Sequence, residues 1–148
     1  MLTTVRDLLR VKGDQVWSIT PETTVFSAIQ ILAEKDVGAL LIQDGDQIVG
    51  IISERDIVRQ IALEQACYLS RPVMTLMTKE VFTVGPETGI DECMQLMTEE
   101  HIRHLPVLEA GHLIGLVSIG DVVKAIITQQ EFTIDQLSKF IDGGGYNQ

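Results

Sequence analysis

Two short stretches of the chain combine residue types that can hold a sugar and a phosphate. Residues 50–56 and residues 115–121 both read Gly-x-x-Ser-x-x-Asp, and each stands where an apolar run gives way to a helical pattern. The start of a helix presents free backbone N–H groups and a partial positive charge. An ionised aspartate can accept both hydrogens of a ribose 2′,3′-diol, a serine hydroxyl can donate to a sugar or phosphate oxygen, and the glycine allows a close approach to the backbone. The candidate ribose residues are therefore Ser53, Asp56, Ser118 and Asp121.

The same spacing also has a purely structural interpretation. A serine that caps a helix, followed three positions later by an acidic residue, resembles a capping box, which satisfies free N–H groups of the first turn. That box prefers Glu or Gln at the second position, whereas both motifs here carry Asp. The sequence leaves both interpretations open: a helix cap alone, or a cap that also holds a ligand.

Basic side chains stand close to the two motifs. Arg103 and His104 precede an apolar run ahead of the second motif, and Arg55 lies inside the first. The planar fork of arginine suits phosphate, and histidine can donate to it. The candidate phosphate residues are therefore Arg55, Arg103 and His104. The alternative is that they are solvated charges. Lys12 could also reach a phosphate, but a lysine at the surface is the expectation there.

Other kinds of chemistry find little support in the sequence. His101 and His104 are three residues apart, but two histidines without further ligands do not make a metal site. No nucleophile, base or carboxylate pair stands in a catalytic pattern. The sequence therefore predicts no bound metal and no enzyme; the rival hypothesis is a nucleotide hydrolase that uses the cleft.

Composition restricts the class of protein. The 148 residues include 11 Lys and Arg against 21 Asp and Glu, a formal net charge of −10, which disfavours nucleic-acid binding. Cys67 and Cys93 are too few for a disulfide framework, and Cys93 falls in a helical apolar pattern that predicts a buried thiol. No segment reads as a signal peptide or a membrane span, so the prediction is a cytoplasmic protein without a membrane partner.

A duplication organises the whole chain. Residues 16–60 and 81–125 align without a gap at an offset of 65 and share 11 identities in 45 positions. A fixed long period predicts that each copy is one supersecondary unit. Two such units form one module with a two-fold pseudo-axis and a pair of equivalent clefts.

Each copy has the pattern β-α-β-β-α. The strands are predicted at Val16–Ile19, Ala39–Gln43 and Ile48–Ile52 in the first copy, and at Val81–Val84, His104–Leu108 and Leu113–Val117 in the second. An apolar spacing of three and four residues predicts the intervening helices, with Thr23 or Thr24 and Thr88 as caps. The fold class is α+β, with helices covering a small sheet.

The predicted organisation follows from the two copies. Its segments are an N-terminal helical segment (1–15), repeat 1 (16–65), a linker (66–80), repeat 2 (81–130), and a C-terminal amphipathic helix with a disordered tail (131–148). That last helix places Ile134, Leu137, Phe140 and Ile141 on one face, which needs something to pack against.

The repeated pattern resembles the cystathionine beta-synthase (CBS) domain pair, or Bateman module. The resemblance covers about Val5–Gln130. It rests on Ser-Ile-Thr-Pro (18–21), Val-Gly-Ala-Leu-Leu-Ile (37–42), Ile-Val-Gly-Ile-Ile-Ser-Glu-Arg-Asp (48–56), Ile-Arg-His-Leu-Pro-Val (102–107) and Leu-Ile-Gly-Leu-Val-Ser-Ile-Gly-Asp (113–121).

This resemblance implies a ligand and an assembly. Members of the family bind adenosine compounds in clefts between the repeats, with AMP the first candidate here and ADP, ATP, NAD or S-adenosylmethionine as alternatives. The family's ribose aspartates correspond to Asp56 and Asp121, and its phosphate-side pair to Arg103 and His104. The implied base-contacting residues are Ile19, Thr20, Val37, Gly38, Ala39, Val84, Ile102 and Pro106. The resemblance also implies a homodimer.

The predicted function is a stand-alone regulatory module that senses an adenosine nucleotide and signals to a partner protein that the sequence does not identify. Because Gly38-Ala39 stands where the second copy has Arg103-His104, the two sites should differ in their selectivity for phosphate. The alternative is a structural or dimerisation module without a physiological ligand.

Overall fold

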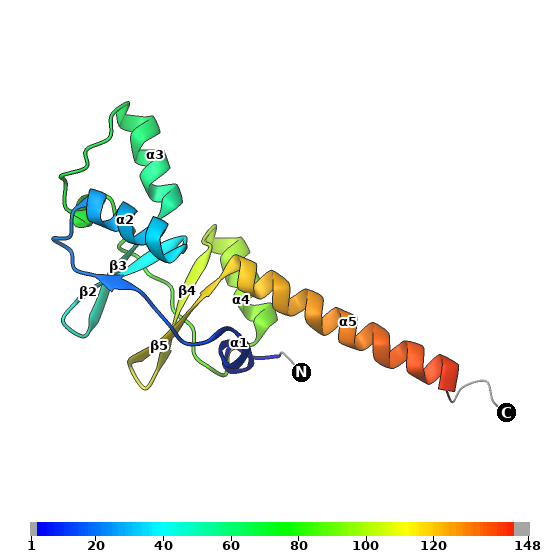
Figure 1. Cartoon of the computed structure of the whole chain (residues 1–148). Coiled ribbons are helices and arrows are strands. Elements are labelled where there is room, and N and C mark those ends of the chain that lie inside the picture. The colour runs from blue at the N-terminus through cyan, green and yellow to red at the C-terminus, as the bar shows by residue number, and fades with distance from the viewer. Residues whose placement is uncertain (1–2, 144–148) are drawn as a thin grey trace. The chain divides into compact units, whose positions relative to one another are not determined.

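The structure is a computed structural model that describes residues 3–143. Its contacts divide the chain into two compact units (Figure 1). The repeat-1 unit comprises residues 16–82, and the repeat-2 unit combines the residues up to 15 with those from 83 onward. The elements are α1 (Val5–Lys12), β1 (Ser18–Ile19), α2 (Val25–Lys35), β2 (Ala39–Asp44), β3 (Gln47–Ser53), α3 (Glu54–Glu64), η1 (Val73–Thr75), α4 (Ile90–Glu100), β4 (His104–Glu109), β5 (His112–Ser118) and α5 (Ile119–Gly143).

In the repeat-1 unit the sheet has the order β1-β2-β3. β1 runs parallel to β2, and β2 pairs antiparallel with β3 through a turn in which Gly45 adopts a positive φ of 63°. The first four residues of β2 are buried, because this central strand is covered on both faces. The predicted hairpin is confirmed.

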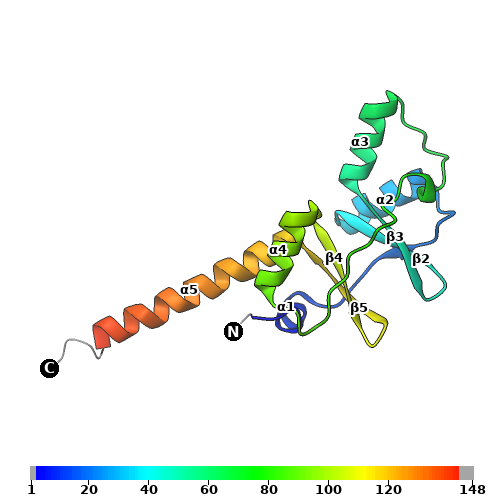
Figure 2. The ribbon, with the colours of Figure 1, turned by 180° about the vertical axis from the view of Figure 1, so that it is seen from behind.

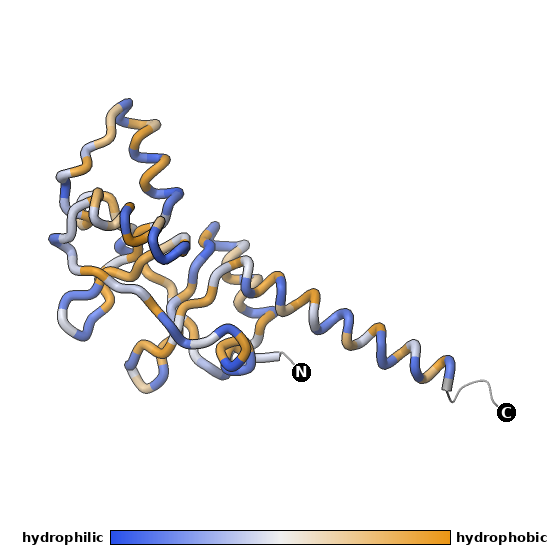
Figure 3. Tube along the Cα trace, viewed as in Figure 1, coloured by the Kyte–Doolittle hydropathy of each residue, from blue (hydrophilic) through white to orange (hydrophobic). Residues whose placement is uncertain are grey.

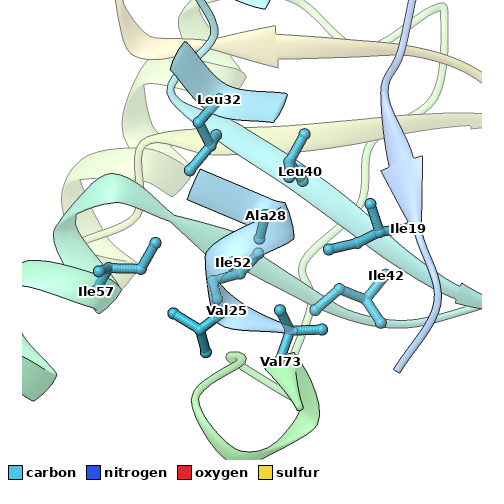
Figure 4. Packing of buried hydrophobic residues seen from close by; sticks show 9 residues of the cluster. All are labelled: Ile19, Val25, Ala28, Leu32, Leu40, Ile42, Ile52, Ile57 and Val73. Atoms are coloured by element: carbon cyan, nitrogen blue, oxygen red, sulfur yellow. The ribbon is translucent and has the colours of Figure 1, made fainter. Parts of the chain in front are cut away.

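The core of the repeat-1 unit joins both helices to the sheet (Figure 4). Leu40, Ile42 and Ile52 of the sheet are fully buried. They form one cluster with side chains from β1, α2, α3 and the linker, namely Ile19, Val25, Ala28, Leu32, Ile57 and Val73. Burying aliphatic side chains in this way is the main stabilising contribution to such a unit.

The repeat-2 unit contains the predicted β4-β5 hairpin. The first strand that the sequence predicts for this unit is reduced to a single bridge. The sequence predicts a strand at Val81–Val84. The structure has one isolated parallel bridge there, between Val84 and Val107. Val84 N–H donates to the carbonyl of Pro106, and Leu108 N–H donates to the carbonyl of Val84. These two bonds, at 3.0 and 2.9 Å, keep the segment beside β4 without extending the ladder.

Each repeat is completed by a lead segment from elsewhere in the chain. The first lead segment (residues 3–12, containing α1) belongs to the repeat-2 unit, and the second lead segment (residues 71–78, containing η1) belongs to the repeat-1 unit. Val5 and Val73 are both fully buried in these units. Figures 1 and 2 show α1 beside β5 from opposite sides.

Both lead segments use the same three backbone hydrogen bonds. In each case a carbonyl of the lead segment accepts from the first N–H of the first long helix of the repeat, α4 or α2. Two N–H groups of the lead segment donate to carbonyls of the residues that precede that helix. The first set is Ile90 to Thr3, Val5 to Thr88 and Arg6 to Pro86, and the second is Val25 to Arg71, Val73 to Thr23 and Met74 to Pro21. The duplication therefore includes the lead segments, at an offset of 68 instead of 65.

The helix caps differ between the two copies. Thr24 caps α2 by accepting from Ser27 N–H, as predicted. In contrast, α4 begins after Gly89 without a side-chain cap. The Thr88 hydroxyl instead accepts from Gly85 N–H at 3.1 Å, so its prediction as a cap is wrong. The first N–H of α4 donates to the carbonyl of Thr3, just as that of α2 donates to the carbonyl of Arg71, so the two helix starts differ only in the side-chain cap.

The C-terminal part of the chain is one long helix. The sequence predicts a helix through Ile127 and a separate amphipathic helix from 131, but α5 runs unbroken over Ile119–Gly143. Residues 128–133 contain neither Gly nor Pro, so nothing in the backbone ends the helix there. The predicted disordered tail falls mainly on residues 144–148, which lie outside the described residues.

The glycine that opens each motif is required by the lead segment. A Cβ on Gly115 would lie 2.7 Å from Leu9 Cδ2, and a Cβ on Gly50 would lie 2.5 Å from Met77 Sδ and 3.1 Å from the Thr78 carbonyl oxygen. Side-chain packing of the lead segments thus explains both glycines without a ligand.

Alanine at these glycines should destabilise the protein. We expect a loss of about 1–3 kcal/mol, the usual range for overpacking, measured as a lower urea midpoint. Gly50→Ala should cost more than Gly115→Ala, because the Thr78 carbonyl is held in a bridge with Ile51, whereas the tip of Leu9 can rotate. Gly85→Ala is the control, since its nearest neighbours would lie at 3.9 Å. Equal midpoints for all three variants would contradict this account.

Candidate functional site

The motif of the repeat-1 unit forms a complete capping box at the start of α3. Asp56 N–H donates to Ser53 Oγ at 3.2 Å, and Asp56 Oδ2 accepts from Ser53 N–H at 2.9 Å and from its hydroxyl at 3.0 Å. Both side chains are half-buried. The capping interpretation is therefore confirmed here. The cap uses only Oδ2 of the Asp56 carboxylate and leaves the other oxygen, Oδ1, outside the capping box.

The motif of the repeat-2 unit repeats this geometry at the start of α5. Ser118 N–H donates to Asp121 Oδ2 at 2.9 Å, and Asp121 N–H donates to Ser118 Oγ at 3.1 Å. Once more the cap uses only one carboxylate oxygen. The two turns therefore present a helix N-terminus and an aspartate in the same arrangement.

A lysine from the first lead segment distinguishes the two turns. Lys12 lies at the surface, as the sequence predicts, but its ammonium donates to Asp121 Oδ2 and to the carbonyl of Leu116. Its position relative to Asp121 depends on how α1 packs, and no local motif signals it. At the offset of 68, the position equivalent to Lys12 is Glu80, two residues after the second lead segment, and a carboxylate cannot form such an ion pair with Asp56.

The ion pair changes the electrostatics of Asp121. Burial opposes ionisation of this carboxyl, but the hydrogen bonds from Lys12 and Ser118 N–H outweigh it and hold its pKa below the ordinary 3.8. The side chains of Lys12 and Asp121 are 32% and 25% exposed, so solvent screens the pair only partly.

The predicted phosphate residues lie at the starts of the two capped helices. The carbonyl of Arg103 accepts from Ile119 N–H at 2.8 Å, just as the carbonyl of Gly38 accepts from Glu54 N–H in the other unit. His104 begins β4 and pairs with Ser118. Arg55 lies in the first turn of α3 and is exposed. Neither Arg55 nor Arg103 forms an ion pair with any residue in 3–143.

The predicted base-contacting residues divide between the two units. Within the repeat-1 unit, Ile19 belongs to the core cluster and Ala39 is 3% exposed, while Thr20 is exposed. The remaining repeat-1 candidates, Val37 and Gly38, are half-buried, as are Val84 and Ile102 of the repeat-2 unit. Pro106 is buried within β4. The half-buried and exposed candidates thus lie at the surface of their units, whereas Ile19, Ala39 and Pro106 are buried.

A cavity of about 540 Å³ lies beside Asp121 in the repeat-2 unit. It is bounded by α1 and α5. Its lining is apolar at Leu8, Val11, Ala125 and Phe132 and polar at Lys12, Asp121, Lys124, Thr128 and Gln129. Sequence reasoning missed this cavity, because it depends on the packing of the first lead segment against α5.

Metal ligands do not gather within the described part of the chain. Across residues 3–143, no three His, Cys, Asp or Glu side chains come together as metal ligands would. His101 ends α4 in the left-handed conformation, with φ at 55°, and His104 lies in β4.

A known domain family matches this chain twice, once in each copy of the duplication. The family model for the CBS domain matches residues 5–63 and 73–128. The chain belongs to the CBS domain family. Each match begins at the buried valine of a lead segment, so the family unit includes the lead segment that precedes it in sequence, whereas contacts join that segment to the other repeat.

Several CBS proteins resemble this chain over most of its length. The CBS domain-containing protein CBSX3, mitochondrial, of Arabidopsis thaliana is 39% identical over 151 residues, which cover 96% of this chain and 73% of that protein. A CBS-domain protein from Burkholderia ambifaria MC40-6 is 46% identical, with a TM-score of 0.81, over 86% of this chain and 96% of its own. The crystal structure of CBSX2 in complex with AMP is 30% identical, with a TM-score of 0.68, over 86% and 98%.

Among residues 3–143, no helix combines the length and the apolar character that are needed to cross a bilayer.

Replacing Lys12 tests the asymmetry between the turns. We expect Lys12→Met to raise the pKa of Asp121 toward its ordinary value and to lower the free energy of unfolding at neutral pH by about 0.5 kcal/mol, as for a partly exposed ion pair. Carboxyl titration by NMR and urea unfolding measure the two effects. Lys124→Met is the control, because Lys124 lines the same cavity without an ion pair within the described residues.

The same pair sets a direction for the pH dependence. A lowered pKa in the folded state means that the stabilisation is present above the ordinary aspartate value and is lost as pH falls through the lower, folded value. Acid unfolding of Lys12→Met should therefore begin at a higher pH than that of the wild type. An unchanged acid midpoint would show that the pair adds no stability.

Proposed function

We propose that this protein is a regulatory module that binds an adenosine nucleotide, with AMP as the first candidate and ADP, ATP, NAD and S-adenosylmethionine as alternatives. It acts without catalysis and as a homodimer, in the cytoplasm. The bound nucleotide favours one conformation of the protein, and an as yet unidentified partner protein recognises that conformation. The size of the response is limited by the difference in affinity of the nucleotide for the two conformations.

One observation carries this proposal: the two Ser/Asp turns have the same geometry, and in each the cap uses a single carboxylate oxygen. The other oxygen of Asp56 or Asp121 is suited to accept from a ribose hydroxyl. The partial positive charge at the helix start and a nearby arginine, Arg55 or Arg103, suit a phosphate. A related protein, CBSX2, has been crystallised in complex with AMP.

The two turns should differ in selectivity. Lys12 offsets the charge of Asp121, and Arg103 precedes the same turn, so the repeat-2 turn carries a net positive charge. The turn at Asp56 has Arg55 alone in its own motif. We therefore expect the repeat-2 turn to favour a ligand with more phosphate than the repeat-1 turn.

A thermal-shift panel with AMP, ADP, ATP, NAD and S-adenosylmethionine tests the function. Ligand at 100 times its Kd should stabilise by about 2.7 kcal/mol, which raises Tm by roughly 5–10 °C for a chain of this size. Mass spectrometry of ligand extracted from the purified protein would identify the physiological compound. No shift with any of the five at millimolar concentration would exclude the proposal.

Asparagine variants separate ligand binding from capping. Asp56→Asn and Asp121→Asn retain an oxygen for the serine N–H but lose the charge, so we expect ligand affinity to fall at least tenfold, or about 1.4 kcal/mol. Asp7→Asn is the matched control, because Asp7 closes the same capping box with Thr4 at the start of α1. It should lose about as much stability as Asp56→Asn, whereas Asp121→Asn also loses the ion pair with Lys12, and it should keep its ligand response.

The alternative function, a dimerisation module without a physiological ligand, predicts no effect of nucleotides on stability. If the module only dimerises, nucleotides should shift the Tm of neither the wild type nor any of the three asparagine variants, and the variants should differ from the wild type only in stability. Conversion of ATP to products, followed by chromatography, would instead indicate the hydrolase that the sequence disfavours.

A further inference from the structure

The helix α5 carries a row of exposed apolar side chains that its own unit does not cover. Ile127, Ile134, Leu137 and Ile141 are 50–63% exposed, and Val123 is 41% exposed. The face that packs within the repeat-2 unit is a different one, where Val122 and Ala125 are 0% and 3% exposed. Figure 3 shows hydrophobic and hydrophilic residues alternating along the whole of α5.

The spacing of this row is that of a coiled coil. The residues Val123, Ile127, Gln130, Ile134, Leu137 and Ile141 follow one another at intervals of four, three, four, three and four. This row is called the α5 seam below. A repeat of 3.5 residues keeps one stripe facing a partner helix, with isoleucine at the a positions (127, 134 and 141) and leucine at a d position (137). β-branched residues at a with leucine at d favour two parallel strands.

Gln130 decides the direction of the partner helix. It is the one polar residue of the seam, at a d position. In a parallel pair in register, Gln130 meets Gln130 of the second copy, and the two amides can hydrogen-bond to each other. An antiparallel pair centred on the seam would place Gln130 against Ile134 and leave a buried amide without a partner, which is unfavourable.

Charge is compatible with self-association in spite of the net charge of −10. The ion pair of the distal helix, Asp135 to Lys139 at 3.1 Å, lies off the seam. A parallel pair would bring Ile126 opposite Glu131 and Thr133 opposite Ser138 at its flanks, so like charges do not face each other there.

We propose that the α5 seam pairs with the α5 seam of a second copy as a parallel, in-register coiled coil. The inference rests on the homodimer of the proposed function and specifies its geometry. The seam spans 19 residues, about 27 Å of helix, which is short for a free-standing coiled coil. It therefore strengthens a dimer that also has contacts elsewhere.

Disulfide cross-linking tests the register. In a Cys67→Ser background, Leu137→Cys should form an oxidised dimer rapidly and nearly completely, because position 137 meets itself in a parallel pair. Cys93 can stay, since it is buried and burial raises the pKa of its thiol to about 11. Lys139→Cys, on the outer face, is the control. Equal cross-linking at both positions, or none at 137, would overturn the proposal.

Sedimentation equilibrium measures the strength of the pair. Ile134→Asp should raise the dimer Kd at least tenfold, whereas Gln136→Asp adds the same charge off the seam and should leave it unchanged. A Kd that is the same for both variants, or a wild type that is monomeric, would refute the seam. The nucleotide thermal shift of Ile134→Asp reports separately on ligand binding, so failure of the seam and failure of the proposed function give different results.

Discussion

The fold of each unit depends on the backbone hydrogen bonds between a repeat and its lead segment. The first N–H of a helix has no partner inside that helix, and an uncompensated buried donor is costly. In both units a carbonyl of the lead segment, from Thr3 or Arg71, accepts this hydrogen bond. The buried Val5 and Val73 then fill the core beside it. A repeat without its lead segment would lack both.

The packing of the lead segments also explains why each motif begins with glycine and why a lysine lies beside Asp121. Gly50 and Gly115 lie directly under side chains of the lead segments, where a Cβ would clash. The first lead segment then continues to Lys12, which reaches Asp121. Packing of one short segment thus determines the backbone before the turn and the charge at the turn, so folding and the candidate site are coupled in the repeat-2 unit.

Capping and ligand binding do not compete for the Ser/Asp turns. The capping box holds the carboxylate through one of its oxygens, and this also fixes the orientation of the other oxygen. A rigid, pre-positioned acceptor loses little entropy on binding. The structural role of the turn is in this sense a precondition for the proposed functional one.

The sequence by itself determined the duplication, the hairpins, the capped helices and the four Ser and Asp residues of the turns, because these depend on local patterns of hydrophobicity and capping. It misassigned the cap of α4 to Thr88, extended the strand at Val81–Val84, and divided α5 into two helices. Only the tertiary structure decided which repeat each lead segment completes and that Lys12 meets Asp121. Those contacts join residues up to 109 positions apart. Local pattern carries no information on such pairs, since they form only when the core of the unit assembles.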